Sequence, residues 1–209
     1  MVTLPRIYPI TDVRISGLSH AEQVKRLTAG GATLIQLREK HFSPRDFYDA
    51  AAETIEFARR RGVKIIINDR VDIALALNAD GVHLGQDDMP PDAARQVLGE
   101  KAIIGFSTHS IEQARAGVKL PIDYIAFGPI FETYTKQGPD TIVGLGRLCE
   151  VKDLAGSVPL VAIGGINRQN LRSIFEAGAD SAAMIGAVVS DEAEITSGMK
   201  EMLQIAANS

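Results

Sequence analysis

Short apolar runs alternate with longer segments of helical periodicity along the whole chain. The runs are rich in β-branched residues, and most are apolar on both faces, as Ile65, Ile66 and Ile67 illustrate. Strands of this kind are buried on both sides, which is typical of a parallel sheet covered by helices. We expect strands at residues 7–11, 33–37, 63–67, 81–84, 102–106, 124–127, 160–163 and 181–185.

Signals for helix ends lie between these runs. Ser19 and Ser110 are each followed, three residues on, by Glu or Gln, which is the spacing of a capping box. Ser43 stands before a proline, a pair typical of a helix start. We expect Asn167 to cap the helical segment that ends at Ala177.

Three joints between a helical segment and the next run repeat one local pattern. Residues 31–33, 78–80 and 178–180 read Gly-Ala-Thr, Asn-Ala-Asp and Gly-Ala-Asp. Glycine and asparagine tolerate the left-handed conformation that ends a helix. The pattern therefore indicates a weak internal repeat of one strand–helix unit.

Eight strands in strict alternation with eight helices admit an open doubly wound sheet or a closed (β/α)8 barrel. The 209 residues suffice for eight units with short connections, near the lower limit for this barrel. The first run is not followed by the Gly-x-Gly-x-x-Gly turn of a dinucleotide-binding sheet. No linker or low-complexity segment interrupts the chain. We therefore predict a single-domain α/β TIM (β/α)8 barrel over residues 1–209.

Composition excludes several functional classes. With 45% hydrophobic residues the chain is too apolar for a disordered protein, yet it has neither a membrane-spanning run nor a signal-peptide pattern. We expect a cytoplasmic protein without a membrane partner. A net charge of −4 and the lack of tryptophan argue against a nucleic-acid partner. Cys149 is the single cysteine, which excludes an intrachain disulfide. The sequence leaves a homo-oligomer open.

Polar side chains cluster after the predicted strands, where barrels carry their chemistry. Gln36, Arg38 and Lys40 occupy alternate positions and so project from one side of an extended chain. Lys136 follows in a later loop. The cations Arg38, Lys40 and Lys136 are suited to hold a diphosphate through charge-assisted hydrogen bonds.

Carboxylates and glycines complete two kinds of anion site. Asp69 and either Asp87 or Asp88 suit Mg²⁺, which prefers one or two carboxylates together with phosphate oxygens. Glycine turns at residues 164–165 and at Gly186 match the phosphate site of many barrels, where backbone N–H groups meet the anion. The sequence thus predicts one anion held by metal and cations, and a second held by the backbone.

Other polar residues have structural interpretations. His83 lies within an apolar run and is expected to be a hydrogen-bonded interior residue, whereas His20 and His41 are expected in solvent. His109 is expected to orient a loop rather than to catalyse. Cys149 has no adjacent base in the sequence and is expected to pack within a helix.

Eight short motifs follow one another along the chain, each weak alone and specific in combination. They are YPITD at residues 8–12, QLREK at 36–40, INDR at 67–70, GVHLGQDD at 81–88, GFSTH at 105–109, GPIF at 128–131, TYTK at 133–136 and IGGI at 163–166. In their order and spacing, these motifs resemble the thiamine phosphate synthase family over nearly the whole chain.

The resemblance implies a barrel enzyme that joins two small molecules, the halves of thiamine. An aminopyrimidine methyl diphosphate loses diphosphate, and the nitrogen of a thiazole phosphate captures the methylene carbon. The resemblance implies Mg²⁺ as cofactor, with Asp69 and Asp88 rather than Asp87 as ligands. It also implies diphosphate contacts at Arg38, Lys40, Asn68 and Lys136, pyrimidine contacts at Gln36 and Ser107, thiazole phosphate contacts at Thr133, Thr135, Gly164, Ile185 and Gly186, and catalytic roles for Arg38, Lys40, Ser107 and Lys136.

The chain departs from the family pattern at two places, and three other functions stay open. Gly186 stands where the family commonly has serine, and Gln-Gly-Pro-Asp follows Lys136 where another lysine is common. A related thiazole tautomerase would have a histidine where this chain has Pro129. A non-catalytic regulator would only bind thiamine precursors. A phosphosugar isomerase or aldolase would need a strand-borne lysine or glutamate base, which the sequence does not offer.

Overall fold

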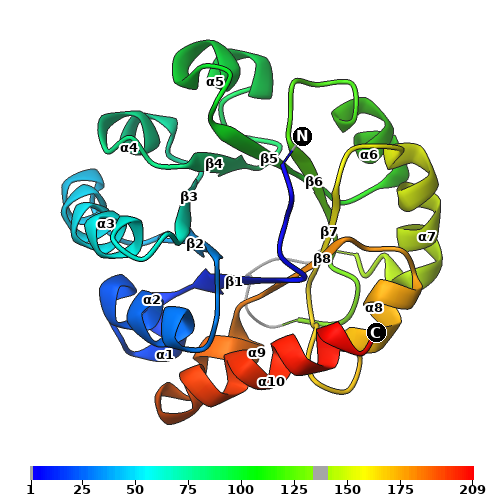
Figure 1. Cartoon of the computed structure of the whole chain (residues 1–209). Helices are drawn as coiled ribbons and strands as arrows, with labels where there is room; N and C mark the ends of the chain where they lie inside the picture. Colours follow the sequence, from blue (N-terminus) through cyan, green and yellow to red (C-terminus); the bar gives the residue numbers. More distant parts are fainter. Residues whose placement is uncertain (1, 134–140) are drawn as a thin grey trace.

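A computed structural model describes residues 2–133 and 141–209. Its parallel strands pair in chain order and close on themselves, β1 with β8, with helices around the outside (Figure 1). The predicted (β/α)8 barrel is thereby confirmed. The strands are β1 Ile7–Thr11, β2 Leu34–Leu37, β3 Lys64–Asn68, β4 Gly81–Leu84, β5 Ile103–Thr108, β6 Tyr124–Phe127, β7 Leu160–Ile163 and β8 Ser181–Met184.

The helices do not alternate one-to-one with the strands, which corrects the sequence expectation. Two helices follow β1, and two helices with a 3-10 turn between them follow β8. None of the described helices is long and apolar enough to cross a membrane. The helices are α1 Val13–Ser16, α2 His20–Ala29, α3 Pro44–Arg59, α4 Val71–Ala76, α5 Pro91–Leu98, α6 Ile111–Gly117, α7 Gly144–Ala155, α8 Leu171–Glu176, α9 Gly186–Val189 and α10 Ile195–Ala207, with the 3-10 turn η1 at Glu192–Glu194.

Most of the predicted helix ends are confirmed. The hydroxyls of Ser19, Ser43 and Ser110 each accept a hydrogen bond from the backbone N–H three residues on. At the repeated joints, Gly31, Asn78 and Gly178 have φ values of 102°, 48° and 95°, the left-handed conformation that the pattern predicted.

The predicted cap at Asn167 is wrong. Helix α8 begins only at Leu171. The Asn167 side chain instead accepts hydrogen bonds from the N–H groups of Gln169 and Asn170, at 2.9 and 3.3 Å. These bonds close a separate turn between β7 and α8, because asparagine competes for backbone donors wherever the local geometry offers them.

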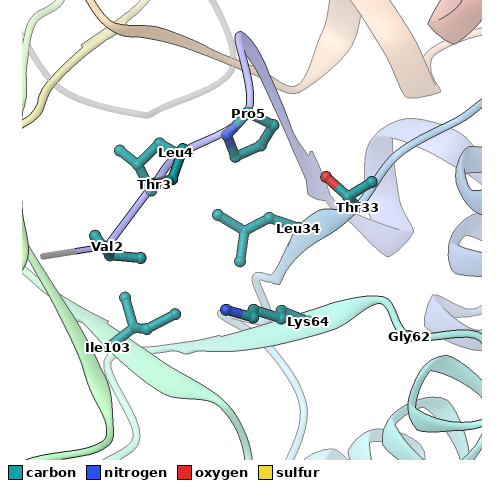
Figure 2. A pocket seen from close by; sticks show the side chains of 9 residues that line it. All are labelled: Val2, Thr3, Leu4, Pro5, Thr33, Leu34, Gly62, Lys64 and Ile103. Atoms are coloured by element: carbon teal, nitrogen blue, oxygen red, sulfur yellow. The ribbon is translucent and has the colours of Figure 1, made fainter.

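The barrel interior changes character along its axis. Tyr8, Ile66, Tyr124 and Val161 belong to a buried cluster formed by inward-facing positions of the strands. On β2 and β3 the inward positions become polar two residues further along, at Gln36 after Leu34 and at Asn68 after Ile66. The opposite end of the barrel is crossed by the N-terminal segment, which borders a hollow together with Leu34, Lys64 and Ile103 (Figures 1 and 2). The polar end is therefore the end that can hold charged ligands.

Three aspartates lock neighbouring strands together at their amino ends. Each stands directly before an even-numbered strand, and its carboxylate accepts a hydrogen bond from a backbone N–H of the preceding strand. The same pair also shares a backbone hydrogen bond in the other direction. The pairs are Asp80 with Ile65, Asp123 with Ile104 and Asp180 with Leu160, each with a carboxylate bond of 2.8 Å.

Replacing Asp123 by alanine is expected to destabilise the barrel. The substitution removes the acceptor of the Ile104 N–H, on a fully buried residue, and the carboxylate that lies 2.7 Å from the Arg95 guanidinium. A buried donor left unpaired costs about 1–3 kcal/mol, so the free energy of unfolding in urea is expected to fall by that amount.

Asp153→Ala on the exposed face of α7 is the matched control, with an expected change within about 0.5 kcal/mol. Asp123→Asn keeps one acceptor oxygen and is expected to lose less than Asp123→Ala. Equal unfolding free energies for Asp123→Ala and Asp153→Ala would contradict the stabilising role of the Asp123 carboxylate.

Candidate active site

Charged side chains that follow β2, β3 and β4 meet at the carboxyl end of the barrel. The Lys40 ammonium pairs with the Asp69 carboxylate. The Gly85 N–H donates to Asp88 Oδ2 at 2.6 Å. Burial raises the pKa of Asp88, and the neighbouring Asp69 raises it further, while the Gly85 N–H and the Lys40 charge oppose the rise. Two carboxylates thus lie next to each other with one cation nearby.

This arrangement fits a divalent cation. Repulsion between the carboxylates of Asp69 and Asp88 is relieved when a cation binds both. Within residues 2–133 and 141–209, no cluster of three or more His, Cys, Asp or Glu side chains is suited to a metal. The remaining ligands would be phosphate oxygens or water, as Mg²⁺ prefers. Asp87 is exposed, so the geometry favours Asp88 between the two alternatives.

Asp69 is held in an unusual backbone conformation. Its φ is 63°, in the left-handed region that few residues other than Gly, Asn and Asp adopt. The Arg70 N–H donates to the Asn68 carbonyl at 2.8 Å, and the Asp69 N–H donates to the His83 carbonyl at 2.8 Å. Such a tight turn stores strain of about 1–3 kcal/mol, typical of functional sites. The turn fixes the carboxylate at the rim relative to β4.

Asn68 offers an unused donor beside this cluster. Its side chain is only 6% exposed, and its Nδ2 atom has no hydrogen-bond partner among the described residues. A buried amide that lacks an acceptor is costly unless a ligand supplies one. Asn68 is therefore suited to an anion, which is the contact that the family resemblance implies.

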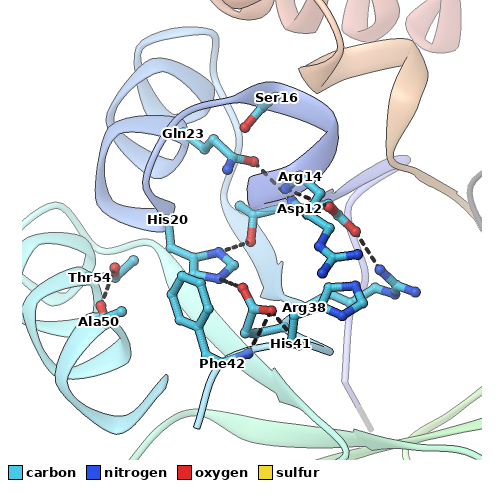
Figure 3. A network of polar contacts seen from close by, with 12 residues as sticks. Asp12, Arg14, Ser16, His20, Gln23, Arg38, His41, Phe42, Ala50 and Thr54 are labelled. Carbon is cyan, nitrogen blue, oxygen red and sulfur yellow. Dashed lines mark hydrogen bonds and ion pairs between the residues drawn. The ribbon is translucent and has the colours of Figure 1, made fainter. Parts of the chain in front are cut away.

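Arg38 is positioned by Asp12, a residue to which sequence reasoning gave no role. Asp12 Oδ1 accepts from the N–H groups of Arg14 and Ile15, at 3.0 and 3.2 Å, and thereby caps α1. Asp12 Oδ2 pairs with the Arg38 guanidinium (Figure 3). The Asp12 N–H donates in turn to Gln23 Oε1 at 3.0 Å. Asp12 is held in place as the cap of α1, and it in turn fixes the Arg38 guanidinium.

The prediction that His20 lies in solvent is wrong, because His20 is 1% exposed. Its Nδ1 lies 2.7 Å from Thr11 Oγ1, and its Nε2 lies 3.4 Å from Glu39 Oε2 (Figure 3). Burial lowers the pKa of His20, and Glu39 opposes this shift. Glu39 also accepts from the His41 N–H at 2.7 Å. Glu39 therefore points into the protein, opposite to its two cationic neighbours, and holds their loop in place.

The two predicted pyrimidine contacts lie in the polar interior. Gln36 Nε2 donates to the Tyr8 hydroxyl at 3.1 Å, and Ser107 Oγ lies 2.8 Å from His83 Nε2. His83 is buried and stacks on the Tyr124 ring, with 5.5 Å between the ring centroids. The prediction of a hydrogen-bonded interior histidine is confirmed.

The glycine turns lie at the ends of β7 and β8. Gly164 has a φ of 98°, and a Cβ there would lie 2.5 Å from Pro129, so the turn requires glycine. Ile185 directly precedes Gly186, the first residue of α9. These adjacent strand ends leave backbone close to the rim, on the side of the barrel away from β3 and β4.

Only some of the remaining predicted residues lie in the part of the chain that the structure describes. Thr133 lies in the described part of the loop after β6, whereas Thr135 and Lys136 lie outside the described residues. His109 Nδ1 lies 2.7 Å from the Gly128 carbonyl oxygen, consistent with a loop-orienting role. Cys149 is exposed on α7, so the expectation that it packs is wrong.

Comparisons with known proteins identify the family of the chain. A family model described as thiamine monophosphate synthase matches residues 7–188. A thiamine-phosphate synthase of Chloroflexus aurantiacus is 43% identical, over 94% of this chain and 90% of that protein. One of Clostridium novyi is 44% identical, over 90% of this chain and 92% of that protein.

A solved structure of a similar protein has the same fold as this chain. The thiamine phosphate pyrophosphorylase of Pyrococcus furiosus superposes with a TM-score of 0.88 at 34% identity, over 97% of this chain and 96% of that one. Sequence and structure thus agree over nearly the whole length of the chain. The chain therefore belongs to the thiamine monophosphate synthase family.

Proposed function

We propose that this chain catalyses the coupling of an aminopyrimidine methyl diphosphate with a thiazole phosphate, forming thiamine phosphate and releasing diphosphate. The chain is then a transferase of thiamine biosynthesis. The observation that carries the proposal is the cluster of Lys40, Asp69 and Asp88 beside Arg38, across the barrel from the glycine turns. One set of groups suits a diphosphate with a cation, and the other suits a phosphate monoester.

Four side chains, together with Mg²⁺, would hold the leaving diphosphate. Arg38 and Asn68 supply hydrogen-bond donors, and Lys40 supplies a charge at the rim. Asp69 and Asp88 would hold Mg²⁺, which would supply further positive charge near the departing group. Lys136, outside the described residues, is assigned to the same diphosphate through the resemblance. These groups stabilise negative charge as it develops on the diphosphate.

The pyrimidine and the thiazole are held by different parts of the rim. Gln36 and Ser107 orient the pyrimidine, whose own amino group donates electrons to the methylene carbon as diphosphate leaves. Backbone at Gly164, Ile185 and Gly186, with Thr133 and Thr135, holds the thiazole phosphate. The chemistry therefore needs no protein nucleophile, and catalysis consists mainly of positioning and charge stabilisation.

The proposal has consequences for partners and location. The ligands are two small molecules and Mg²⁺, and the reaction requires neither nucleic acid nor a membrane surface. A cytoplasmic enzyme formed by one barrel domain over residues 1–209 is part of the proposal, and a homo-oligomer stays open. A tautomerase needs no metal, so the neighbouring carboxylates of Asp69 and Asp88 favour coupling over proton transfer.

The purified protein is expected to form thiamine phosphate and diphosphate from the two substrates with Mg²⁺, and to stop in EDTA. Asp69→Asn is expected to lower this turnover by about 100-fold or more, since the metal contributes several kcal/mol. Asparagine tolerates the φ of 63° at this position, so the melting temperature should change little.

Asp87→Asn removes an exposed carboxylate next to Asp88 and is the matched control, with unchanged turnover expected. Full turnover in Asp69→Asn would remove the metal assignment. Absence of coupling by the unmodified protein, with both substrates and Mg²⁺ present, would overturn the proposed function itself.

Gly186→Ser is expected to tighten the thiazole phosphate site. Gly186 is not among the glycines with a positive φ, so serine fits its backbone conformation. A hydroxyl hydrogen bond to a charged phosphate is worth about 1.5–3 kcal/mol, so the KM for thiazole phosphate should fall at least about tenfold. The KM for the pyrimidine diphosphate should stay constant. A shift in the pyrimidine KM alone would place the thiazole phosphate elsewhere.

A further inference from the structure

A continuous chain of hydrogen bonds crosses the barrel interior between the two predicted pyrimidine contacts. Gln36 Nε2 lies 3.1 Å from the Tyr8 hydroxyl, and the Tyr8 and Tyr124 hydroxyls lie 3.0 Å apart. The Tyr124 hydroxyl lies 2.9 Å from His83 Nδ1, and His83 Nε2 lies 2.8 Å from Ser107 Oγ. Five side chains from five strands thus form one path, which joins Gln36 on β2 to Ser107 on β5.

The orientation of the Gln36 amide sets the direction of this path. Because Gln36 donates to Tyr8, the Tyr8 hydroxyl hydrogen is left to donate to Tyr124. The Tyr124 hydrogen then goes to His83 Nδ1, and the His83 Nε2–H donates to Ser107 Oγ. In the opposite direction both Gln36 and Tyr124 would donate to Tyr8. Its own buried hydrogen would then have no acceptor among the described residues of the path.

We propose that Tyr8, Tyr124 and His83 are positioning residues whose one-way hydrogen bonds fix His83 as the Nε2–H tautomer and leave the Ser107 hydroxyl hydrogen for the pyrimidine. This inference rests on the proposed function for the identity of the ligand. The direction of the path itself is a property of the free protein. The two claims therefore fail separately.

Burial keeps the path neutral. Tyr8 and Tyr124 are almost fully buried, and burial raises the pKa of both phenols above their usual value. Burial also lowers the pKa of His83 to about 4. The rings stay uncharged near neutral pH, so hydrogen-bond direction is the property that the path transmits.

The fold makes room for the path. A Cβ at Gly105 would lie only 2.0 Å from the Tyr124 ring, so the ring reaches its place because β5 carries glycine there. The Tyr8 ring meets the Tyr124 ring edge-on, with 5.9 Å between the ring centroids, and the His83 ring stacks on the Tyr124 ring. The residues are thus locked by packing as well as by hydrogen bonds.

The two ends of a one-way path have opposite character. In the proposed direction Ser107 presents a donor, and Gln36 keeps its amide oxygen as an acceptor. The edge of an aminopyrimidine likewise carries a donor, the amino group, beside an acceptor, the ring nitrogen. Reversal of all the hydrogen bonds in the path would leave Ser107 with an acceptor and Gln36 with a donor for the ring. The interior therefore couples the two contacts that orient the ring.

The tautomer of His83 in the free protein tests the direction. The protein has four histidines, and ¹⁵N NMR of histidine-labelled protein, assigned with His83→Gln, distinguishes a protonated from an unprotonated ring nitrogen. We expect a single neutral tautomer at pH 7, with hydrogen on Nε2 and none on Nδ1. Hydrogen on Nδ1, or a mixture of both tautomers, would overturn the proposal whatever the activity of the protein.

Tyr124→Phe tests whether the path sets the tautomer. Loss of the hydroxyl is expected to abolish the preference at His83 and to lower kcat/KM for the pyrimidine diphosphate about tenfold, with the KM for thiazole phosphate unchanged. Tyr48→Phe changes an exposed tyrosine on α3 and is the matched control. An unchanged His83 tautomer in Tyr124→Phe would show that the path does not set it.

Discussion

Closure of the parallel barrel is the constraint on which the site depends. Because β1 pairs with β8, every strand has two neighbours and all carboxyl ends lie at one rim. The pleat then decides which residues face inward, and the register places Asn68 beside His83. At the opposite end of the barrel, Asp80, Asp123 and Asp180 hydrogen-bond to the backbone of the preceding strand. Residues distant in sequence thus meet at the rim without a dedicated element to bring them together.

The two cations that follow β2 are each paired before any ligand binds. Arg38 is paired with Asp12, and Lys40 is paired with Asp69. Asp12 is fixed by the helix that it caps, and Glu39 is fixed beside a buried histidine. Groups held this way need little reorganisation when charge develops on a leaving group, which is the main source of electrostatic catalysis. Without these partners, the side chains of Arg38 and Lys40, two residues apart after β2, would repel each other and sample many rotamers.

The sequence predicts the barrel well, because doubly apolar strands and left-handed joints are local signals. It also identifies rim residues by chemical type, as with Asn68 and Asp69. It does not predict the burial of His20, since that depends on contacts with Thr11 at the end of β1 and with Glu39 after β2, which only the folded barrel brings together. The failed cap at Asn167 has a similar cause, because Asn167 and Asn170 accept backbone hydrogen bonds within one turn that precedes the helix.

A crystal structure with thiamine phosphate, diphosphate and Mg²⁺ would show whether each anion has its own part of the rim. We expect the diphosphate against Arg38 and Asn68, with the metal held by Asp69 and Asp88. We expect the phosphate of the product against the backbone of Gly164 and Gly186. Exchange of the two anions, or binding of either one away from this rim, would overturn the assignment of the two anion sites.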